Sequence, residues 1–343
     1  MSGPYIGFAV SFVVALVGTR VIELWARRSS IYDRFTERSA HVHPTPRLGG
    51  GAILLATVVG SILGSAGLEG HALLLLGGAT SLFAVGLIDD LRPMSVLPRA
   101  LAQALVAALT ALTLQPAIEI QLPFASFHVD GMGAVLLASV WLVAVMNVFN
   151  FMDGIDGMVG GVTAITVPAA IALAGGAATT PILIALAAAC LGFLMWNHPP
   201  ASIFMGDGGS VVIGYLIAAV WVAAEARPAP ALAAAIALAP FLLDATATLV
   251  RRVRAGADLT AAHNDHLYQR LLKRGYSNRV TCGVYVVAST CAGMAAVLYA
   301  VSGDLARASI LGVLALAVAG YIAAVRWTSD ERPPAGPVGA ASD

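Results

Sequence analysis

Long apolar segments recur along almost the whole chain, and they restrict the folds that it can adopt. A helix needs about 20 mainly apolar residues to cross the hydrocarbon core of a bilayer. The segments here are continuous runs, without the regular alternation of apolar and polar residues that marks a membrane β-strand. The sequence therefore predicts an all-α polytopic membrane protein. Composition agrees, since 59% of the 343 residues are hydrophobic, 11% are charged and the mean hydropathy is +0.84.

We expect about eleven transmembrane helices, each containing one of these runs. The runs cover residues 5–18, 52–66, 71–88, 97–114, 133–145, 159–173, 181–196, 211–224, 231–250, 280–301 and 308–325. The run at 231–250 contains Pro240, which removes a helical hydrogen bond, so this span is expected to be kinked. Residues 1–326 are predicted to form a single integral-membrane domain. The Pro- and Gly-rich residues 327–343 are predicted to form a disordered cytoplasmic tail.

The basic residues lie almost entirely on one side of the predicted topology. The first apolar run has no Lys or Arg before it, so we interpret it as an uncleaved span with the N-terminus outside. When loops are assigned alternately, all 19 Lys and Arg residues except Arg227 and Arg307 fall on the inner side. The positive-inside rule therefore predicts a cytoplasmic C-terminus. The net charge is zero, so charge gives no indication of a nucleic-acid partner.

Five polar segments interrupt the apolar pattern, and all of them lie on the predicted cytoplasmic side. They are residues 43–51, 89–99, 147–157, 197–210 and 251–279. Polar side chains are costly when they face lipid, so a membrane protein places them at the ends of spans or in cavities. Packing alone would scatter such groups over both faces. Their accumulation on one face predicts a ligand site there.

Two kinds of side chain in these segments suit phosphoryl transfer. The first kind is acidic, and its members are Asp89, Asp90, Asp153, Asp156 and Asp207. Carboxylates that are brought together repel one another unless a cation or a proton intervenes, and such oxygen ligands suit Mg²⁺. The second kind suits phosphate, and its members are Arg47, Arg99, His263, His266 and Arg270. Together they are the groups expected of a metal-assisted phosphoryl-transfer site.

Other interpretations of single residues stay open from the sequence. His263 and His266, at i and i+3, would share a face if their segment were helical, and zinc would then be an alternative metal. Phe204 could stack on a nucleotide base or pack at the end of a span. Asp244, inside the kinked span, would suit a secondary transporter or lipid flippase. The cysteines lack metal-ligand spacing and are interpreted as small buried hydrophobes: Cys190, Cys282 and Cys291.

The polar segments also carry five motifs in a fixed order. They are His-Pro-Thr-Pro-Arg-Leu-Gly-Gly from His43, Asp89-Asp90 with Arg99, Asn-x-x-Asn-x-x-Asp-Gly-Ile-Asp-Gly from Asn147, Phe-Met-Gly-Asp-Gly-Gly-Ser from Phe204, and His-x-x-His-Leu-Tyr-Gln-Arg from His263. In these motifs, over about residues 5–326, the chain resembles the polyprenyl-phosphate N-acetylhexosamine-1-phosphate transferases, glycosyltransferase family 4. Any one of the motifs is weak alone, whereas five in register are specific.

The resemblance implies that a lipid phosphate attacks the β-phosphorus of a UDP-N-acetylhexosamine, so that sugar 1-phosphate passes to the lipid and UMP leaves. It implies Mg²⁺, or Mn²⁺ in its place, as cofactor. Asp207 and Asn150 resemble the metal ligands, and Asp89 or Asp90 is similar to the residue proposed to orient or deprotonate the lipid phosphate. The residues that resemble the uridine and ribose pocket are Asp153, Gly154, Asp156, Asn197 and Phe204. The phosphate-binding residues implied are Arg47, Arg99, His263, His266 and Arg270.

Within the superfamily, Pro-Thr-Pro-Arg and His-x-x-His-Leu-Tyr-Gln-Arg resemble the glycan-initiating branch. Phospho-N-acetylmuramoyl-pentapeptide transferase is the alternative, but that branch has a Thr-Pro-Thr-Met-type loop and adjacent histidines. The resemblance implies UDP-GlcNAc or a related UDP-N-acetyl sugar as donor and undecaprenyl or another polyprenyl phosphate as acceptor. It also implies a multi-pass protein of the bacterial inner membrane, active in the first membrane step of envelope polysaccharide synthesis. The sugar, the polyprenol, a one-step or covalent mechanism, and a monomeric or homodimeric state are left open.

Overall fold

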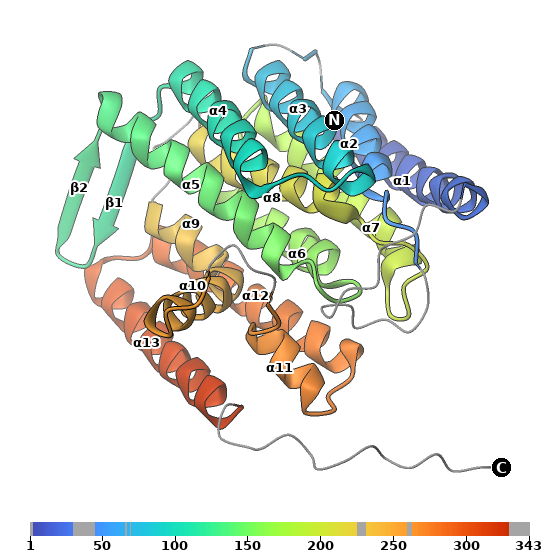
Figure 1. Ribbon diagram of the computed structural model, residues 1–343. Helices are drawn as coiled ribbons and strands as arrows, with labels where there is room; N and C mark the ends of the chain where they lie inside the picture. The colour runs from blue at the N-terminus through green and yellow to red at the C-terminus, as the bar shows by residue number, and fades with distance from the viewer. Residues whose placement is uncertain are drawn as a thin grey trace, which may run out of the picture.

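The computed structural model describes residues 3–29, 45–65, 67–68, 70–224, 231–258 and 263–328. This part of the chain is a bundle of helices with a β-hairpin at its edge (Figure 1). The helices are α1 (Gly3–Arg28), α2 (Gly50–Gly64), α3 (His71–Leu91), α4 (Val96–Leu114), α5 (Gly131–Met152), α6 (Met158–Ala174), α7 (Thr179–Asn197), α8 (Gly206–Val222), α9 (Ala231–Ala237), α10 (Ala239–Arg254), α11 (Leu267–Lys273), α12 (Asn278–Val301) and α13 (Asp304–Trp327). His43 of the first motif and residues 329–343 of the predicted tail lie outside the described residues.

The helices have the lengths and composition of membrane spans. Within the described ranges, seven are long and apolar enough to cross a bilayer: α1, α3, α4, α5, α7, α12 and α13. The pair α9 and α10 passes the same test with a bend of 84° between its members, and α2, α6 and α8 are shorter apolar helices. The bend follows Ala237 and Pro240 stands in the first turn of α10, which confirms the predicted kink. A helical polytopic membrane protein is therefore confirmed.

Two helices, α1 and α5, extend furthest beyond the apolar runs that predicted them. The run 5–18 continues as helix to Arg28, because Glu23 is buried there and accepts bonds from Arg20 Nη1 (2.6 Å) and Arg27 Nε (2.9 Å). The run 133–145 continues to Met152, so Asn147 lies within α5. The asparagines of the third polar segment are thus helical, and only the residues after them form a turn.

Helix α8 is the central helix of the bundle. All of its residues from 208 to 221 are buried, and it packs against α2, α3 and α5 (Figure 1). Glycines allow this close packing at the N-terminal end of α8. A Cβ on Gly50 of α2 would overlap the Gly209 Cα, and a Cβ on Gly86 of α3 would overlap the Gly208 Cα. The Gly-Asp-Gly-Gly motif therefore brings three backbones together around Asp207.

Replacing Gly86 by alanine should lower both stability and activity. The new methyl group would force α3 and α8 apart close to Asp90 and Asp207. Overpacking of this kind lowers the free energy of unfolding by about 1–3 kcal/mol or more. Thermal unfolding of the purified variant measures the first effect, and an assay of the activity that the sequence motifs imply measures the second. Gly77→Ala is the matched control in the same helix, because a Cβ there meets no atom within 4 Å. Equal behaviour of the two variants would contradict the packing argument.

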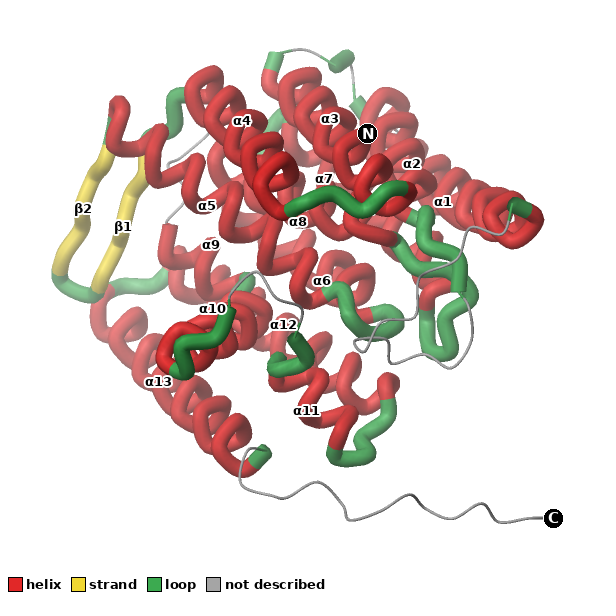
Figure 2. Tube along the Cα trace, viewed as in Figure 1, coloured by secondary structure: helices red, strands yellow, loops and turns green. Residues whose placement is uncertain are grey.

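The hairpin lies at the edge of the bundle opposite α1 (Figure 2). Strands β1 (Ile118–Leu122) and β2 (Ala125–Val129) pair antiparallel, with Ile118 opposite Val129. The prediction of an all-α protein did not include this hairpin. Tyr299 of α12 fastens the hairpin by donating its hydroxyl to the Gln121 carbonyl (2.5 Å).

Candidate active site

Arg47 is positioned by backbone pairing between two segments far apart in the sequence. The Phe204 N–H donates to the Pro46 carbonyl (2.8 Å), and the Gly49 N–H donates to the Phe204 carbonyl (2.9 Å). Residues 45–50 therefore lie alongside the segment that leads into α8. This pairing holds both Arg47 and Phe204 next to the N-terminus of that helix.

Asp90, in the last turn of α3, binds the N-terminus of α8. Its Oδ1 accepts a hydrogen bond from the Asp207 N–H (3.1 Å), and its Oδ2 accepts one from the Gly208 N–H (3.3 Å). The first N–H groups of a helix lack partners within the helix and favour negative charge, so a carboxylate is stabilising there. Arg47 binds the same carboxylate through Nε (3.1 Å) and Nη2 (2.6 Å). Asp90 thus joins α3, α8 and the Arg47 segment.

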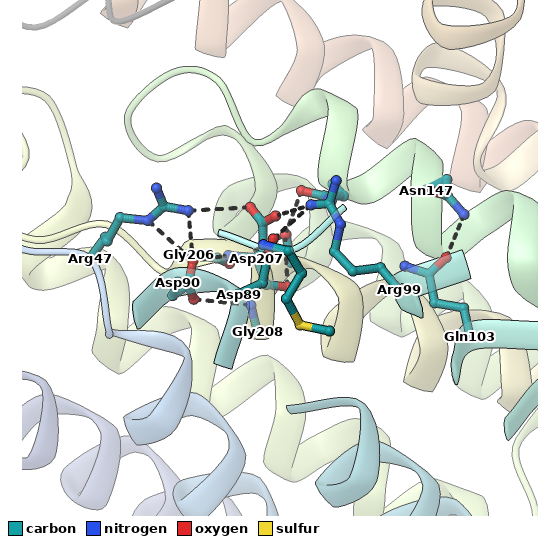
Figure 3. Close-up of polar contacts among 12 residues, drawn as sticks. Arg47, Asp89, Asp90, Arg99, Gln103, Asn147, Gly206, Asp207 and Gly208 are labelled. Atoms are coloured by element: carbon teal, nitrogen blue, oxygen red, sulfur yellow. Dashed lines mark hydrogen bonds and ion pairs between the residues drawn. The ribbon is translucent and has the colours of Figure 1, made fainter. Parts of the chain in front are cut away.

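Asp207 lies between two arginines (Figure 3). Arg99 Nη1 is 3.0 Å from its Oδ2, and Arg47 Nη2 is 3.6 Å from its Oδ1. Arg99 Nη1 also donates to Asp89 Oδ2 at 2.7 Å. The side chain of Asp207 is 26% exposed, against 8% for Asp89 and 3% for Asp90. Of these three carboxylates, Asp207 is therefore the most accessible to a ligand.

Asn150 and Asp153 lie at the end of α5, across from the first turns of α8. The Ser210 hydroxyl, about one turn after Asp207, donates to Asn150 Oδ1 at 3.3 Å. Burial raises the pKa of Asp153 to about 8, and the negative charges of Asp207 and Asp90 contribute to the rise. Acidic side chains are therefore concentrated where the two helices meet.

Three of the predicted nucleotide-binding residues instead join the turns around the site. Asn197 accepts from the Gly157 N–H (3.0 Å) and donates to the Ile203 carbonyl (2.9 Å). Asp156 Oδ2 accepts from the Ala201 N–H at 3.0 Å. Gly154 packs under Tyr268, because a Cβ at Gly154 would overlap the tyrosine hydroxyl.

Asn197 and Asp156 hold the α5–α6 turn against the 198–203 segment. The turn that a nucleotide would contact is thus held in place by two of the residues that were predicted to bind the nucleotide.

The residues directly before α11 are not helical, and the helix begins only after the second histidine of the motif. Helix α11 begins at Leu267 with His266 as its N-cap, so His263 and His266 do not share a helix face. Their rings nevertheless stack, with centroids 5.2 Å apart. Arg270 Nε donates to the Asp265 carbonyl at 3.0 Å, which keeps its guanidinium beside the same segment.

The acidic side chains fit Mg²⁺ better than a metal held wholly by protein ligands. Among the described residues, no three His, Cys, Asp or Glu side chains are grouped to hold a metal, so the zinc alternative gains no support. Mg²⁺ commonly uses one or two carboxylates together with substrate phosphates and water. The accessible Asp207, the amide oxygen of Asn150 and the raised pKa of Asp153 match that requirement, because a cation would offset the local excess of negative charge.

Two contacts around the site were not predicted from the sequence. Asn147, which had no assigned role, donates to Gln103 Oε1 at 2.7 Å and so joins α5 to α4, one turn beyond Arg99 (Figure 3). Tyr268 donates its hydroxyl to the Phe151 carbonyl at 3.2 Å. Tyr268 stands in the His-x-x-His-Leu-Tyr-Gln-Arg motif, so its motif was noticed but its partner was not.

Fold and site together define a polytopic membrane protein with an acidic, arginine-lined site where α3 and α5 end and α4 and α8 begin. The chain belongs to glycosyl transferase family 4, whose family model matches residues 72–225. This membership confirms the family that the five motifs indicated.

Relatives identify the branch of the family. A decaprenyl-phosphate N-acetylglucosaminephosphotransferase of Mycobacterium tuberculosis is 30% identical over 94% of this chain and 89% of its own length. A probable undecaprenyl-phosphate N-acetylglucosaminyl 1-phosphate transferase of Bacillus subtilis is 28% identical over 80% of this chain and 79% of its own length. A phospho-N-acetylmuramoyl-pentapeptide-transferase of Saccharopolyspora erythraea is 30% identical over 64% of this chain and 75% of its own length. The chain falls in the polyprenyl-phosphate N-acetylglucosamine-1-phosphate transferase branch.

Proposed function

We propose that this protein transfers N-acetylglucosamine 1-phosphate, or a closely related N-acetylhexosamine 1-phosphate, from its UDP-sugar to polyprenyl phosphate and releases UMP. The observation that carries the proposal is the position of Asp207 on a helix N-terminus between Arg47 and Arg99. A cation-binding carboxylate next to two guanidinium groups can receive a pyrophosphate, which is both a metal ligand and an arginine ligand. The relatives are named as undecaprenyl-phosphate and decaprenyl-phosphate transferases, and these names support polyprenyl phosphate as the acceptor.

Asp207 and Asn150 would hold Mg²⁺, with Mn²⁺ as a substitute. The ion would neutralise charge that develops on the pyrophosphate oxygens as the bond to UMP breaks. Arg47 and Arg99 would bind the same oxygens from both sides. His263, His266 and Arg270 would contact phosphate from the α11 side, because Tyr268 fixes that segment next to the end of α5.

Asp89 and Asp90 would orient or deprotonate the acceptor phosphate. Each carboxylate is bonded to an arginine, Asp89 to Arg99 and Asp90 to Arg47. A substrate phosphate would compete for those guanidinium groups, because two of its oxygens can bind a guanidinium group as the two oxygens of a carboxylate do. Movement of an arginine onto phosphate would therefore release an Asp oxygen beside the acceptor.

The uridine and ribose would lie against the α5–α6 turn and Phe204, with Asp153, Gly154, Asp156 and Asn197 shaping the pocket. Eleven spans would be reached if α2, α6, α8 and the bent α9–α10 pair each cross or enter the bilayer. In that topology the N-terminus is outside and the site faces the cytoplasm, where UDP-sugars are found. We assign the protein to a bacterial inner membrane, in the first membrane step of envelope polysaccharide synthesis, with a homodimer as one possible assembly.

The reaction can be tested with purified protein in detergent, undecaprenyl phosphate, Mg²⁺ and a panel of UDP-N-acetyl sugars. UMP release, together with mass spectrometry of the lipid, is expected to show one sugar 1-phosphate added per acceptor. UMP release with UDP-GlcNAc would identify the donor directly. No release with any sugar of the panel would refute the transferase proposal.

The requirement for Mg²⁺ should depend on pH. Because the pKa of Asp153 is raised to about 8, this side chain holds a proton below that pH when no metal is bound. A cation and that proton compete for the same negative site, so the Mg²⁺ concentration for half-maximal activity should fall as pH rises from about 6.5 to 8.5. Asp153→Asn should flatten this dependence. If the Mg²⁺ requirement of the wild type does not change across that pH range, the proposed competition between the Asp153 proton and the metal ion is wrong.

A further inference from the structure

Asp244, which the proposed reaction does not use, is completely buried in α10. The Tyr285 hydroxyl of α12 donates to its Oδ2 (2.5 Å), and the Tyr321 hydroxyl of α13 lies 3.3 Å from its Oδ1. The Leu267 N–H at the start of α11 donates to the same Oδ1 (2.9 Å). A buried carboxylate is costly unless donors surround it, and here the donors come from three other helices. A transported ion would have to displace these donors, so the site does not favour the transporter interpretation.

His266 faces the same carboxylate. Its Nδ1 lies 3.3 Å from Asp244 Oδ1, and its side chain is 5% exposed. Within the described ranges, no contact of Nδ1 meets the full geometry of a hydrogen bond, and the Gln269 N–H in the first turn of α11 also faces this side chain. A buried ring nitrogen needs a hydrogen-bonding partner, and Asp244 Oδ1 is an acceptor within reach. A carboxylate can only accept, so the proton of this contact belongs to Nδ1.

The His266 ring is held beside the candidate active site by its neighbours. It stacks between His263 (centroids 5.2 Å) and Tyr268 (5.6 Å), and it lies 6.2 Å from the Phe151 ring at the end of α5. Tyr268 is bonded in turn to the Phe151 carbonyl. With Nδ1 directed at Asp244, Nε2 is the ring nitrogen left for a ligand.

One face of α10 holds the whole segment around this histidine. Thr248 and Arg251 follow Asp244 at helical spacing, and Arg251 Nη2 donates both to Thr248 Oγ1 (3.0 Å) and to the Asp265 carbonyl (2.6 Å). Arg252 Nη1 donates to Asp265 Oδ2 at 2.9 Å. The backbone before His266 is therefore held by Arg251 and Arg252 in addition to the contacts that Asp244 makes with Thr248 and Leu267.

We propose that Asp244 is a positioning residue that fixes His266 as its Nδ1–H tautomer and presents Nε2 to the substrate phosphates. The substrate in this statement rests on the proposed transferase function, whereas the tautomer does not. Nε2 can then accept a proton from the acceptor phosphate, or donate a hydrogen bond to the pyrophosphate when the ring is charged. A carboxylate behind a histidine sets tautomer and orientation in the same way in the Ser-His-Asp triad and in metal sites.

The tautomer can be measured without any activity. In protein labelled with ¹⁵N-histidine, the His266 signals are identified by their loss in His266→Gln. At alkaline pH we expect a protonated Nδ1 and an unprotonated Nε2, and Asp244→Asn should move proton occupancy toward Nε2. Tyr285→Phe is the matched control, because it removes a donor to Asp244 Oδ2 and leaves the His266 contact in place. A wild-type His266 protonated on Nε2 overturns the proposal, even if Asp244→Asn fails to fold.

The kinetic test is a double-mutant cycle. Asp244→Asn alone should lower kcat by about 10–100-fold, as loss of an orienting partner does elsewhere. In the His266→Gln background the same change should cause little further loss, because both changes disable one unit. Multiplicative losses would show that Asp244 supports the fold and not the histidine, and would overturn the proposal. A wild-type protein without transferase activity would refute the proposed function while the tautomer measurement still decides this one.

Discussion

Asp207→Asn should lower turnover by on the order of 10³-fold while leaving the protein folded and inserted. Asparagine keeps the size of the side chain and its backbone place in the first turn of α8. It removes the negative charge that would bind Mg²⁺. The same charge lies between the guanidinium groups of Arg47 and Arg99. Steady-state UMP release at saturating Mg²⁺ measures the loss, and thermal unfolding with size-exclusion chromatography checks the fold.

Asp304→Asn is the control for a change of charge alone. Asp304 is 48% exposed at the start of α13, where its contact is Arg307 Nη1 at 3.8 Å. It should retain nearly full activity, since an exposed ion pair contributes little. Turnover by Asp207→Asn within a few-fold of the wild type would remove Asp207 from the metal-binding role and would leave Asn150 and Asp153 to be tested.

Arg99→Ala should cost about 10²-fold or more in kcat/KM. Its Nη1 lies within 3.0 Å of carboxylate oxygens on both Asp89 and Asp207, so its guanidinium group joins the two acids. The variant would lose a charge-assisted contact to the pyrophosphate, which matters most as charge develops in the transition state. Arg99→Lys should recover only part of the activity, because an ammonium group cannot bind two oxygens in the fork geometry of a guanidinium.

Arg92 provides the matched control for Arg99. It belongs to the same polar segment, residues 89–99, lies just after α3 and is exposed, whereas Arg99 lies in the first turn of α4. Arg92→Ala removes the same charge from the same side of the protein, so electrostatic attraction of the anionic substrates over distance changes equally. Similar losses in the two variants would mean that Arg99 acts through the general positive charge of this face, and not through the site.

The helical membrane fold and the polar segments could be predicted because both depend on local sequence. A run of about 20 apolar residues is a span wherever it occurs, and polar residues within it must be at its ends or enclosed. The ends of the helices were less certain. Helix α5 continues through Asn147 because this side chain donates a hydrogen bond to Gln103 on α4. The apolar pattern of α5 does not indicate that partner.

The candidate residues of the site could be named from the sequence, but their contacts could not. Asp90 was expected to act on the acceptor phosphate, and it is found at the N-terminus of α8 in contact with Arg47. The Gly-Asp-Gly-Gly stretch was noted only as part of a family motif, and its glycines are found against Gly50 and Gly86. Each of these contacts joins residues 43 or more positions apart, and no periodic pattern specifies such a partner.

Sequence alone therefore determined that the chain is a helical membrane protein, which family motifs it carries, and which acids, arginines and histidines are available for phosphoryl transfer. Only the tertiary structure decided that Asp207 is the accessible acid between two arginines and that Asp244 lies behind His266. The physical reason is that hydropathy acts on each segment separately. Hydrogen bonds, ion pairs and close glycine contacts are determined instead by which segments pack together, and at what distance.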